Sequence, residues 1–195
     1  MTSLPGVVRV SPTLIALPTA LALIAAVEEA RSQLLHAVRD MNEAQSRFKP
    51  VDGVWSVVEI VEHLYLAELS GVTKIWTAAD TVRNGVRWLD PLPNSGKPVE
   101  QIIAETWKAR EIAPPIATPH IGGPLSFWCA AHATLTAMLR QLGDRLDGLV
   151  LEDVVFPHYL SGPMDARQRL EFLRFHIERH HAQAQQVMAH PAFPR

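Results

Sequence analysis

The sequence contains a single cysteine, Cys129, among its 195 residues. This scarcity excludes an intrachain disulfide and the paired-cysteine spacing of redox and zinc-knuckle motifs, and it fits the reducing cytoplasm that we expect as the location. Blocks of like charge are also missing, because 18 Lys and Arg residues are interspersed with 20 Asp and Glu residues. Without a basic stripe to neutralise phosphates, the composition gives no support to nucleic-acid binding.

Long hydrophobic runs are rare as well, and the clearest is TLIALPTALALIAAV at residues 13–27. The run is too short to span a membrane. A signal-peptide core is the alternative interpretation, but Pro18 interrupts the run and only Arg9 supplies charge before it. We therefore expect a disordered leader over residues 1–18 and a single helical domain over residues 19–195.

Apolar spacing is helical almost throughout, and no segment alternates long enough to predict a strand. Capping boxes at Ser56 with Glu59 and at Asp165 with Gln168 mark two helix starts. The pattern predicts an all-α four-helix bundle with an irregular insertion at residues 85–124, between the second and third long helices. Residues 143–164 are expected to be irregular, and the insertion to hold a short helix at 99–110. The predicted long helices span residues 19–46, 56–83, 125–142 and 165–190.

The stretch FHIERHHAQ at residues 175–183 is rich in histidine. His176 and His180 lie about 40° apart around a helix, on the face that also carries apolar side chains, so their ring nitrogens can converge on one metal ion. His181 lies about 140° from His176 and is expected to be exposed and not a ligand. An HxxxH pair is common by chance, so a histidine of the core remains the alternative.

His63, within WSVVEIVEHLYLAE, is the best candidate for a third ligand because it shares an apolar face with Ile60 and Leu64. A single hydrogen bond would satisfy it as a core residue. Three buried imidazoles without partners would leave polar groups unsatisfied, whereas one cation would satisfy all three. The remaining histidines are weaker candidates: His132 can face the core, His158 can line the mouth of a site, and surface or loop positions fit His36, His120 and His190.

GVWSVVEIVEHLYLAE at residues 53–68 and HYLSGPMDARQRLEFLRFHIERHHAQ at residues 158–183 together resemble the DinB-like, damage-inducible four-helix bundle superfamily. The matching positions are Trp55, Ser56, His63, Leu64, Gly162, His176, His180 and Gln183. The resemblance spans roughly residues 19–190. It implies one divalent metal ion bound by His63, His176 and His180, with water completing the coordination shell. A homodimer is implied as well, and the long first helix and apolar insertion carry more hydrophobic surface than a minimal bundle needs.

Members of this superfamily with known activity are mostly metal-dependent transferases or isomerases that use a low-molecular-weight thiol, and others are thought to be hydrolases. Three neutral imidazoles leave a metal such as zinc, nickel or iron with an open position that activates water or a thiol. The first hypothesis is therefore a metal-dependent enzyme for transfer, isomerisation or hydrolysis of a small-molecule substrate. The second is a non-catalytic bundle that binds a metal or small ligand in stress response. The sequence identifies no catalytic base among Glu59, Glu62 and Glu68.

Overall fold

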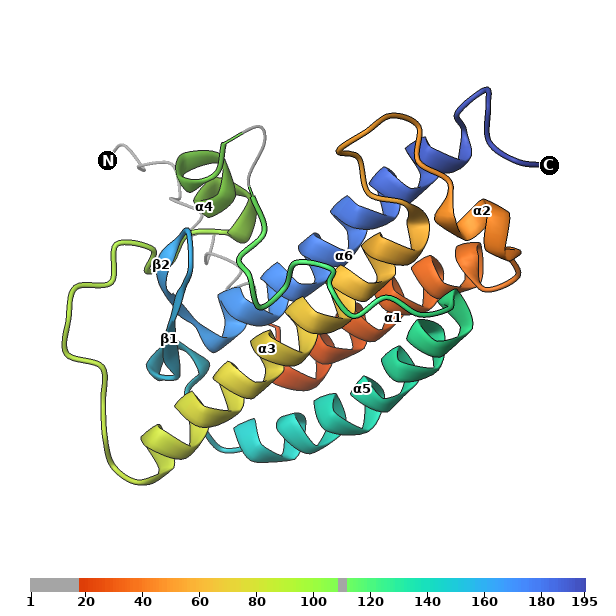
Figure 1. Cartoon of the computed structure of the whole chain (residues 1–195). Helices are drawn as coiled ribbons and strands as arrows, with labels where there is room; N and C mark the ends of the chain where they lie inside the picture. Colours follow the sequence, from red (N-terminus) through yellow and green to blue (C-terminus); the bar gives the residue numbers. More distant parts are fainter. Residues whose placement is uncertain (1–17, 109–111) are drawn as a thin grey trace, which may run out of the picture.

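The computed structural model describes residues 18–108 and 112–195 (Figure 1). Its four long helices are α1 (Ala20–Val38), α3 (Val57–Arg83), α5 (Leu125–Leu146) and α6 (Ala166–Met188). Helices α1 and α3 each pack against both α5 and α6, and α3 runs antiparallel to α6. This arrangement confirms the predicted all-α four-helix bundle. The predicted leader lies outside the described residues except for Pro18.

The bundle interior is apolar and draws on every long helix. Leu34, Ile60, Leu139 and Leu170, one from each helix, are fully buried. Each such side chain contributes about 1.5–3 kcal/mol relative to an exposed one. None of the helices in the described part of the chain is long and apolar enough to cross a membrane.

One polar cluster ties three helices together inside the bundle. Arg31 of α1 pairs with Glu68 of α3 and donates a hydrogen bond to Thr136 Oγ1 of α5 at 2.8 Å. Fully buried His132 of α5 donates from Nε2 to the Val61 carbonyl at 3.0 Å. His132 is therefore a core histidine with one ring nitrogen hydrogen-bonded, and its Nδ1 lies 3.7 Å from Glu68 Oε2.

The predicted first helix is wrong beyond Val38. Helix α1 ends there, and a separate short helix, α2 (Glu43–Arg47), follows. The Asn42 side chain accepts a hydrogen bond from the Gln45 backbone N–H, and the Gln45 side chain accepts one from the Asn42 backbone. This capping box starts a new helix without any Pro or Gly to signal the break.

The third long helix is longer than predicted, because α5 continues through Gly143 to Leu146. A Cβ atom at Gly143 would lie 3.0 Å from Leu21 Cδ2 and 3.3 Å from Ile24 Cδ1. The glycine therefore serves the close packing of α1 on α5 and does not end the helix.

The expectation that residues 143–164 are irregular is wrong in part. A 3-10 turn, η1 (Leu151–Asp153), precedes an antiparallel hairpin of β1 (Val155–His158) and β2 (Gly162–Asp165). Strands of four residues are too short to show an alternating pattern. The hairpin leads directly into Asp165, the N-cap of α6.

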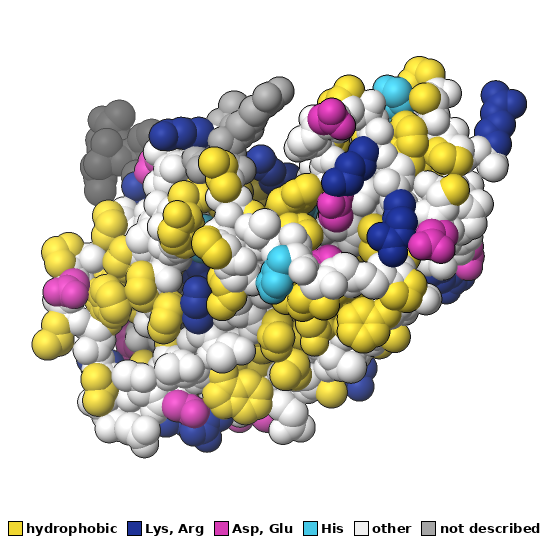
Figure 2. Space-filling view, viewed as in Figure 1, with side chains coloured by type: hydrophobic (Ala, Val, Ile, Leu, Met, Phe, Trp, Pro, Cys, Tyr) yellow, Lys and Arg dark blue, Asp and Glu magenta, His cyan; other side chains and the backbone are white. Residues whose placement is uncertain are grey.

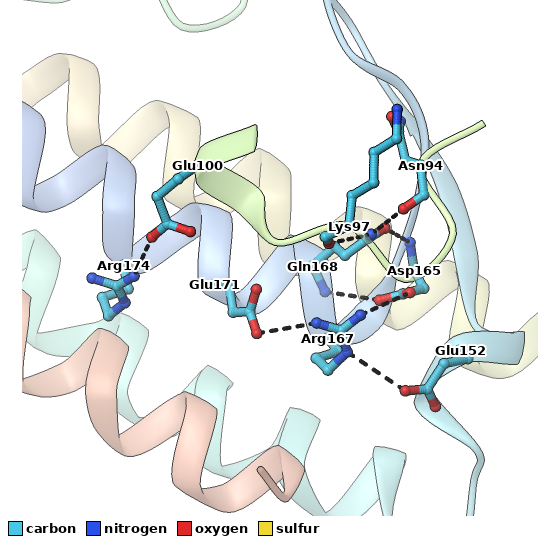
Figure 3. Close-up of polar contacts among 9 residues, drawn as sticks. All are labelled: Asn94, Lys97, Glu100, Glu152, Asp165, Arg167, Gln168, Glu171 and Arg174. Atoms are coloured by element: carbon cyan, nitrogen blue, oxygen red, sulfur yellow. Dashed lines mark hydrogen bonds and ion pairs between the residues drawn. The ribbon is translucent and has the colours of Figure 1, made fainter. Parts of the chain in front are cut away.

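The start of α6 anchors the insertion (Figure 3). Asp165 caps the helix by accepting from the Gln168 backbone N–H at 2.8 Å. The Gln168 amide donates to the carbonyls of Asn94 at 2.6 Å and Lys97 at 3.0 Å. The short helix α4 (Val99–Thr106) follows, ending before the predicted residue 110. Its apolar side packs into a second small core with α6 and β2, made of Val99, Ile102, Ile103, Met164 and Phe172.

Candidate metal centre

Three histidines meet where α3 faces α6. Nε2 of His176 lies 3.3 Å from Nε2 of His63 and 3.2 Å from Nε2 of His180. One ligand atom from each residue falls within 4.8 Å of the others, and the three side chains are 4 %, 8 % and 9 % exposed for His63, His176 and His180. The structure thus brings all three predicted site residues together. His181 lies apart, with its Nε2 3.4 Å from the Gln185 amide.

The outer ring nitrogens fix the tautomers of two of these histidines. Nδ1 of His63 donates to the Ala117 carbonyl at 2.7 Å, and Nδ1 of His180 donates to Gln183 Oε1 at 2.7 Å. With the proton on Nδ1, each neutral ring presents an Nε2 lone pair to the centre. Contacts of this kind orient metal-binding histidines in proteins.

Burial keeps the three rings neutral. It lowers the pKa of His63, and burial with the nearby His63 lowers the pKa of His180 to about 3. Burial, reinforced by the neighbouring histidines, holds the pKa of His176 well below its ordinary value. The Nε2 lone pairs of His63 and His180 both face Nε2 of His176, and these rings do not retain protons at neutral pH. A cation placed between the three nitrogens would satisfy all of them at once.

The nitrogen spacing fits a metal ion. Nitrogens that are each about 2.0–2.1 Å from one tetrahedral ion lie about 3.3 Å from one another. The two Nε2–Nε2 distances of 3.3 Å and 3.2 Å agree with this value. Neutral imidazole is a common ligand of zinc, nickel and iron. The arrangement can therefore hold one divalent ion and leave a coordination position for a ligand from outside.

Glu62 supports the centre through a loop of the insertion. Its buried carboxylate accepts hydrogen bonds from the backbone N–H groups of residues 120–122, at 2.7, 2.6 and 3.1 Å. The same loop carries the Ala117 carbonyl that orients His63. Sequence reasoning gave Glu62 no role, because nothing in its local pattern indicates which backbone it meets.

The other two nearby glutamates are engaged elsewhere. Glu59 completes the cap at Ser56 and bonds Lys49 at 2.7 Å, and Glu68 pairs with Arg31. Each of the three glutamates near His63 in the sequence therefore has a structural partner.

Aromatic rings flank the three histidines on both sides. Trp55 packs on His63 and His180, with ring centres 4.7 Å and 6.1 Å away. On the other side Phe172 stacks on His176 at 5.5 Å, and Trp107 meets His176 edge-on at 6.5 Å. Trp107 belongs to the insertion, and no sequence signal pointed to it.

His158 lies behind this aromatic side of the centre, on β1. Its ring packs on Phe172 at 4.5 Å and on Trp107 at 5.9 Å. Nδ1 accepts hydrogen bonds from the backbone N–H groups of Leu160 and Ser161, both at 3.2 Å. Burial, with nearby cationic side chains, lowers the pKa of His158 to about 3. It is a neutral wall residue close to the site.

Comparison with known protein families agrees with this geometry. Residues 26–184 match the DinB superfamily, a range that includes all three converging histidines and most of the chain. No curated protein and no solved structure matches the sequence. The chain belongs to the DinB superfamily.

Proposed function

We propose that this protein binds one divalent metal ion at His63, His176 and His180 and acts as a metal-dependent enzyme. The observation that carries the proposal is the convergence of three buried, neutral imidazoles, in which Nε2 of His176 lies 3.3 Å from Nε2 of His63 and 3.2 Å from Nε2 of His180. A bound zinc, nickel or iron ion would supply an electrophilic position that lowers the pKa of a coordinated thiol or water. The proposed reaction is transfer or isomerisation with a low-molecular-weight thiol, or hydrolysis of a small substrate.

The residues of the chain would bind the metal ion, orient the imidazoles and shield the centre from bulk water. Ala117 and Gln183 hold two of the imidazoles in the binding tautomer. Trp55, Trp107 and Phe172 surround the rings with apolar surface, which excludes bulk water and suits the uncharged body of a small molecule. The thiol as co-substrate is supported by the family and not by a specific contact.

The proposed setting is the cytoplasm, with no nucleic-acid or membrane partner. On the face shown in Figure 2, Lys and Arg side chains are mixed with Asp and Glu and do not gather into a stripe. The balanced composition supports the same proposal.

A second candidate function is favoured by the low exposure of the site. Because the three histidines are only 4–9 % exposed and flanked by aromatic rings, a non-catalytic metal- or ligand-binding bundle also fits. Such a protein would hold its ligand without turnover.

Turnover separates the two functions. Metal-loaded protein, the His176→Ala variant and the matched His181→Ala control are tested against a panel of small electrophiles, with and without added thiol. The enzyme hypothesis expects turnover by the loaded protein and the control, and its loss in His176→Ala. Equal rates for all three proteins across the panel would leave only the binding function.

A further inference from the structure

Arg169 of α6 is a buried cation that forms no ion pair with any carboxylate of residues 18–108 and 112–195. The residue is 5 % exposed, and its Nε and Nη1 atoms have no hydrogen-bond partner among the described residues. Its Cζ lies 5.9 Å from the centre of the Phe172 ring. Arg167, two residues earlier, is by contrast paired with Glu152, Asp165 and Glu171. Burial lowers the pKa of Arg169 to about 10, so the side chain stays charged at neutral pH.

Lys74 adds a second positive charge on α3, the helix that packs against α6. Its Nζ lies 5.9 Å from the centre of the Phe156 ring, and no ion pair joins it to a carboxylate within the described part of the chain. Burial lowers the pKa of Lys74, and the charge of Arg169 lowers it further. Two cations brought together without an acid repel each other, and a bound anion removes both the repulsion and the unmet hydrogen-bonding capacity.

The two cations lie on the same seam as the three histidines. Arg169 precedes His176 by seven residues, which is two turns and about 10 Å along one face of α6. Lys74 follows His63 by eleven residues, about three turns along one face of α3. The Phe172 ring lies between the two groups, 5.5 Å from the His176 ring and 5.9 Å from Arg169 Cζ. The Phe172 ring thus separates the charged end of the seam from the histidine end.

We propose that Arg169 and Lys74 form an anion subsite that binds the carboxylate of a small molecule whose other end lies at the three histidines. The planar guanidinium matches a carboxylate in shape and charge. The Phe172 ring between the two ends would contact an apolar spacer about 10 Å long. The inference about the far end of the molecule rests on the proposed function, whereas carboxylate binding at Arg169 does not. The carboxylate belongs either to the thiol or to the electrophilic substrate.

Straight-chain thiols that end in a carboxylate test this arrangement. The full-length protein is loaded with Co²⁺, whose absorption changes when a thiol sulfur binds. Acids HS–(CH₂)n–COO⁻ of increasing length are titrated beside the mercapto-alcohols of equal length. We expect the acid to bind at least about tenfold tighter than the alcohol, with the greatest difference near eight carbons, the length that matches two helical turns.

Variants assign this difference to the two cations. Arg169→Met and Lys74→Met should abolish the acid–alcohol difference, while Arg140→Met, which removes an exposed arginine of α5, should preserve it. Lys74 is only half-buried, so its variant tests the subsite even if Arg169→Met alters folding. Equal affinity of acid and alcohol for the wild-type protein would overturn the proposal.

Calorimetry measures carboxylate binding at the subsite independently of the metal chemistry. If no thiol changes the Co²⁺ spectrum, the proposed thiol function fails. The subsite is then tested alone, by titrating octanoate and octanol into metal-free protein. Octanoate binding that disappears in Lys74→Met supports the subsite, and absence of octanoate binding overturns it. Where turnover is measurable, octanoate should raise the KM of the reactant that carries the carboxylate, which distinguishes the thiol from the electrophile.

Discussion

Glu62 and His63 are adjacent in the sequence and hold the same loop. The Glu62 carboxylate accepts hydrogen bonds from the backbone N–H groups of residues 120–122, and His63 Nδ1 donates a hydrogen bond to the carbonyl of Ala117. The insertion is therefore attached to α3 at two successive residues, one of which is a candidate metal ligand. Metal binding and loop position should consequently depend on each other.

Replacing Glu62 tests this coupling. In Glu62→Gln the side-chain NH₂ group faces backbone donors, so the loop loses its anchor and the Ala117 carbonyl no longer orients His63. We expect metal affinity to fall roughly tenfold or more, the usual effect of losing a contact that orients a ligand. Competition with a chromophoric chelator measures the affinity.

Glu105→Gln is the matched control, because Glu105 bonds Lys97 and Gln101 at an exposed position of α4. The metal affinity of Glu105→Gln should equal that of the wild-type protein. If Glu62→Gln also binds metal normally, the loop does not position His63.

Single alanine substitutions define the metal-binding set. His63→Ala, His176→Ala and His180→Ala should each lose most of the bound metal, because two nitrogens then remain of the three that converge. His181→Ala should keep nearly full content, since His181 lies outside the cluster. Elemental analysis of the purified variants measures this. Metal loss in His181→Ala with retention in His180→Ala would show that α6 binds metal through its other face.

Local sequence signals predicted the parts of the site that depend on one helix. The capping boxes at Ser56 and Asp165 placed the starts of α3 and α6 correctly. The HxxxH spacing placed His176 and His180 on one inward face, because helical geometry alone sets that relation.

The remaining parts of the fold and site depend on contacts between distant segments. Trp107, Ala117 and Arg169 carry no motif, and each gains its role from what another element brings beside it. The helix break at Asn42 and the continuation of α5 through Gly143 likewise depend on capping and packing. The homodimer stays a prediction, to be checked by sedimentation.

The buried histidines predict how stability depends on pH in the metal-free protein. The pKa values of His158 and His180 are about 3 in the folded chain, against an ordinary value of 6.5 for exposed histidine. Between these values the unfolded chain binds protons that the folded chain does not, so stability falls as the pH falls from 6.5 towards 3. Each such histidine contributes a slope of roughly 1.4 kcal/mol per pH unit.

Urea denaturation at pH 7, 5.5 and 4.5 measures this slope. His158→Gln removes one proton-binding group from the unfolded chain. It should therefore reduce the dependence of the unfolding free energy on pH by the slope of one histidine, roughly 1.4 kcal/mol per pH unit. His36→Gln is a control, because His36 lies near the surface at the end of α1. An unchanged slope in His158→Gln would mean that His158 is not held neutral in the fold.

Arg169 and Arg167 predict opposite effects on stability, although both are buried arginines of the first turn of α6. Arg169→Met removes a buried charge that has no acidic partner in the described part of the chain, so the free energy of unfolding should rise, by about 1 kcal/mol or more. Arg167→Met removes the partner of Glu152, Asp165 and Glu171, so stability should fall by roughly 1–3 kcal/mol. Thermal denaturation of both variants provides the comparison. A loss of stability in Arg169→Met equal to that of Arg167→Met would show that the Arg169 guanidinium stabilises the fold. A gain in stability would show that the protein retains the Arg169 charge at a cost in stability.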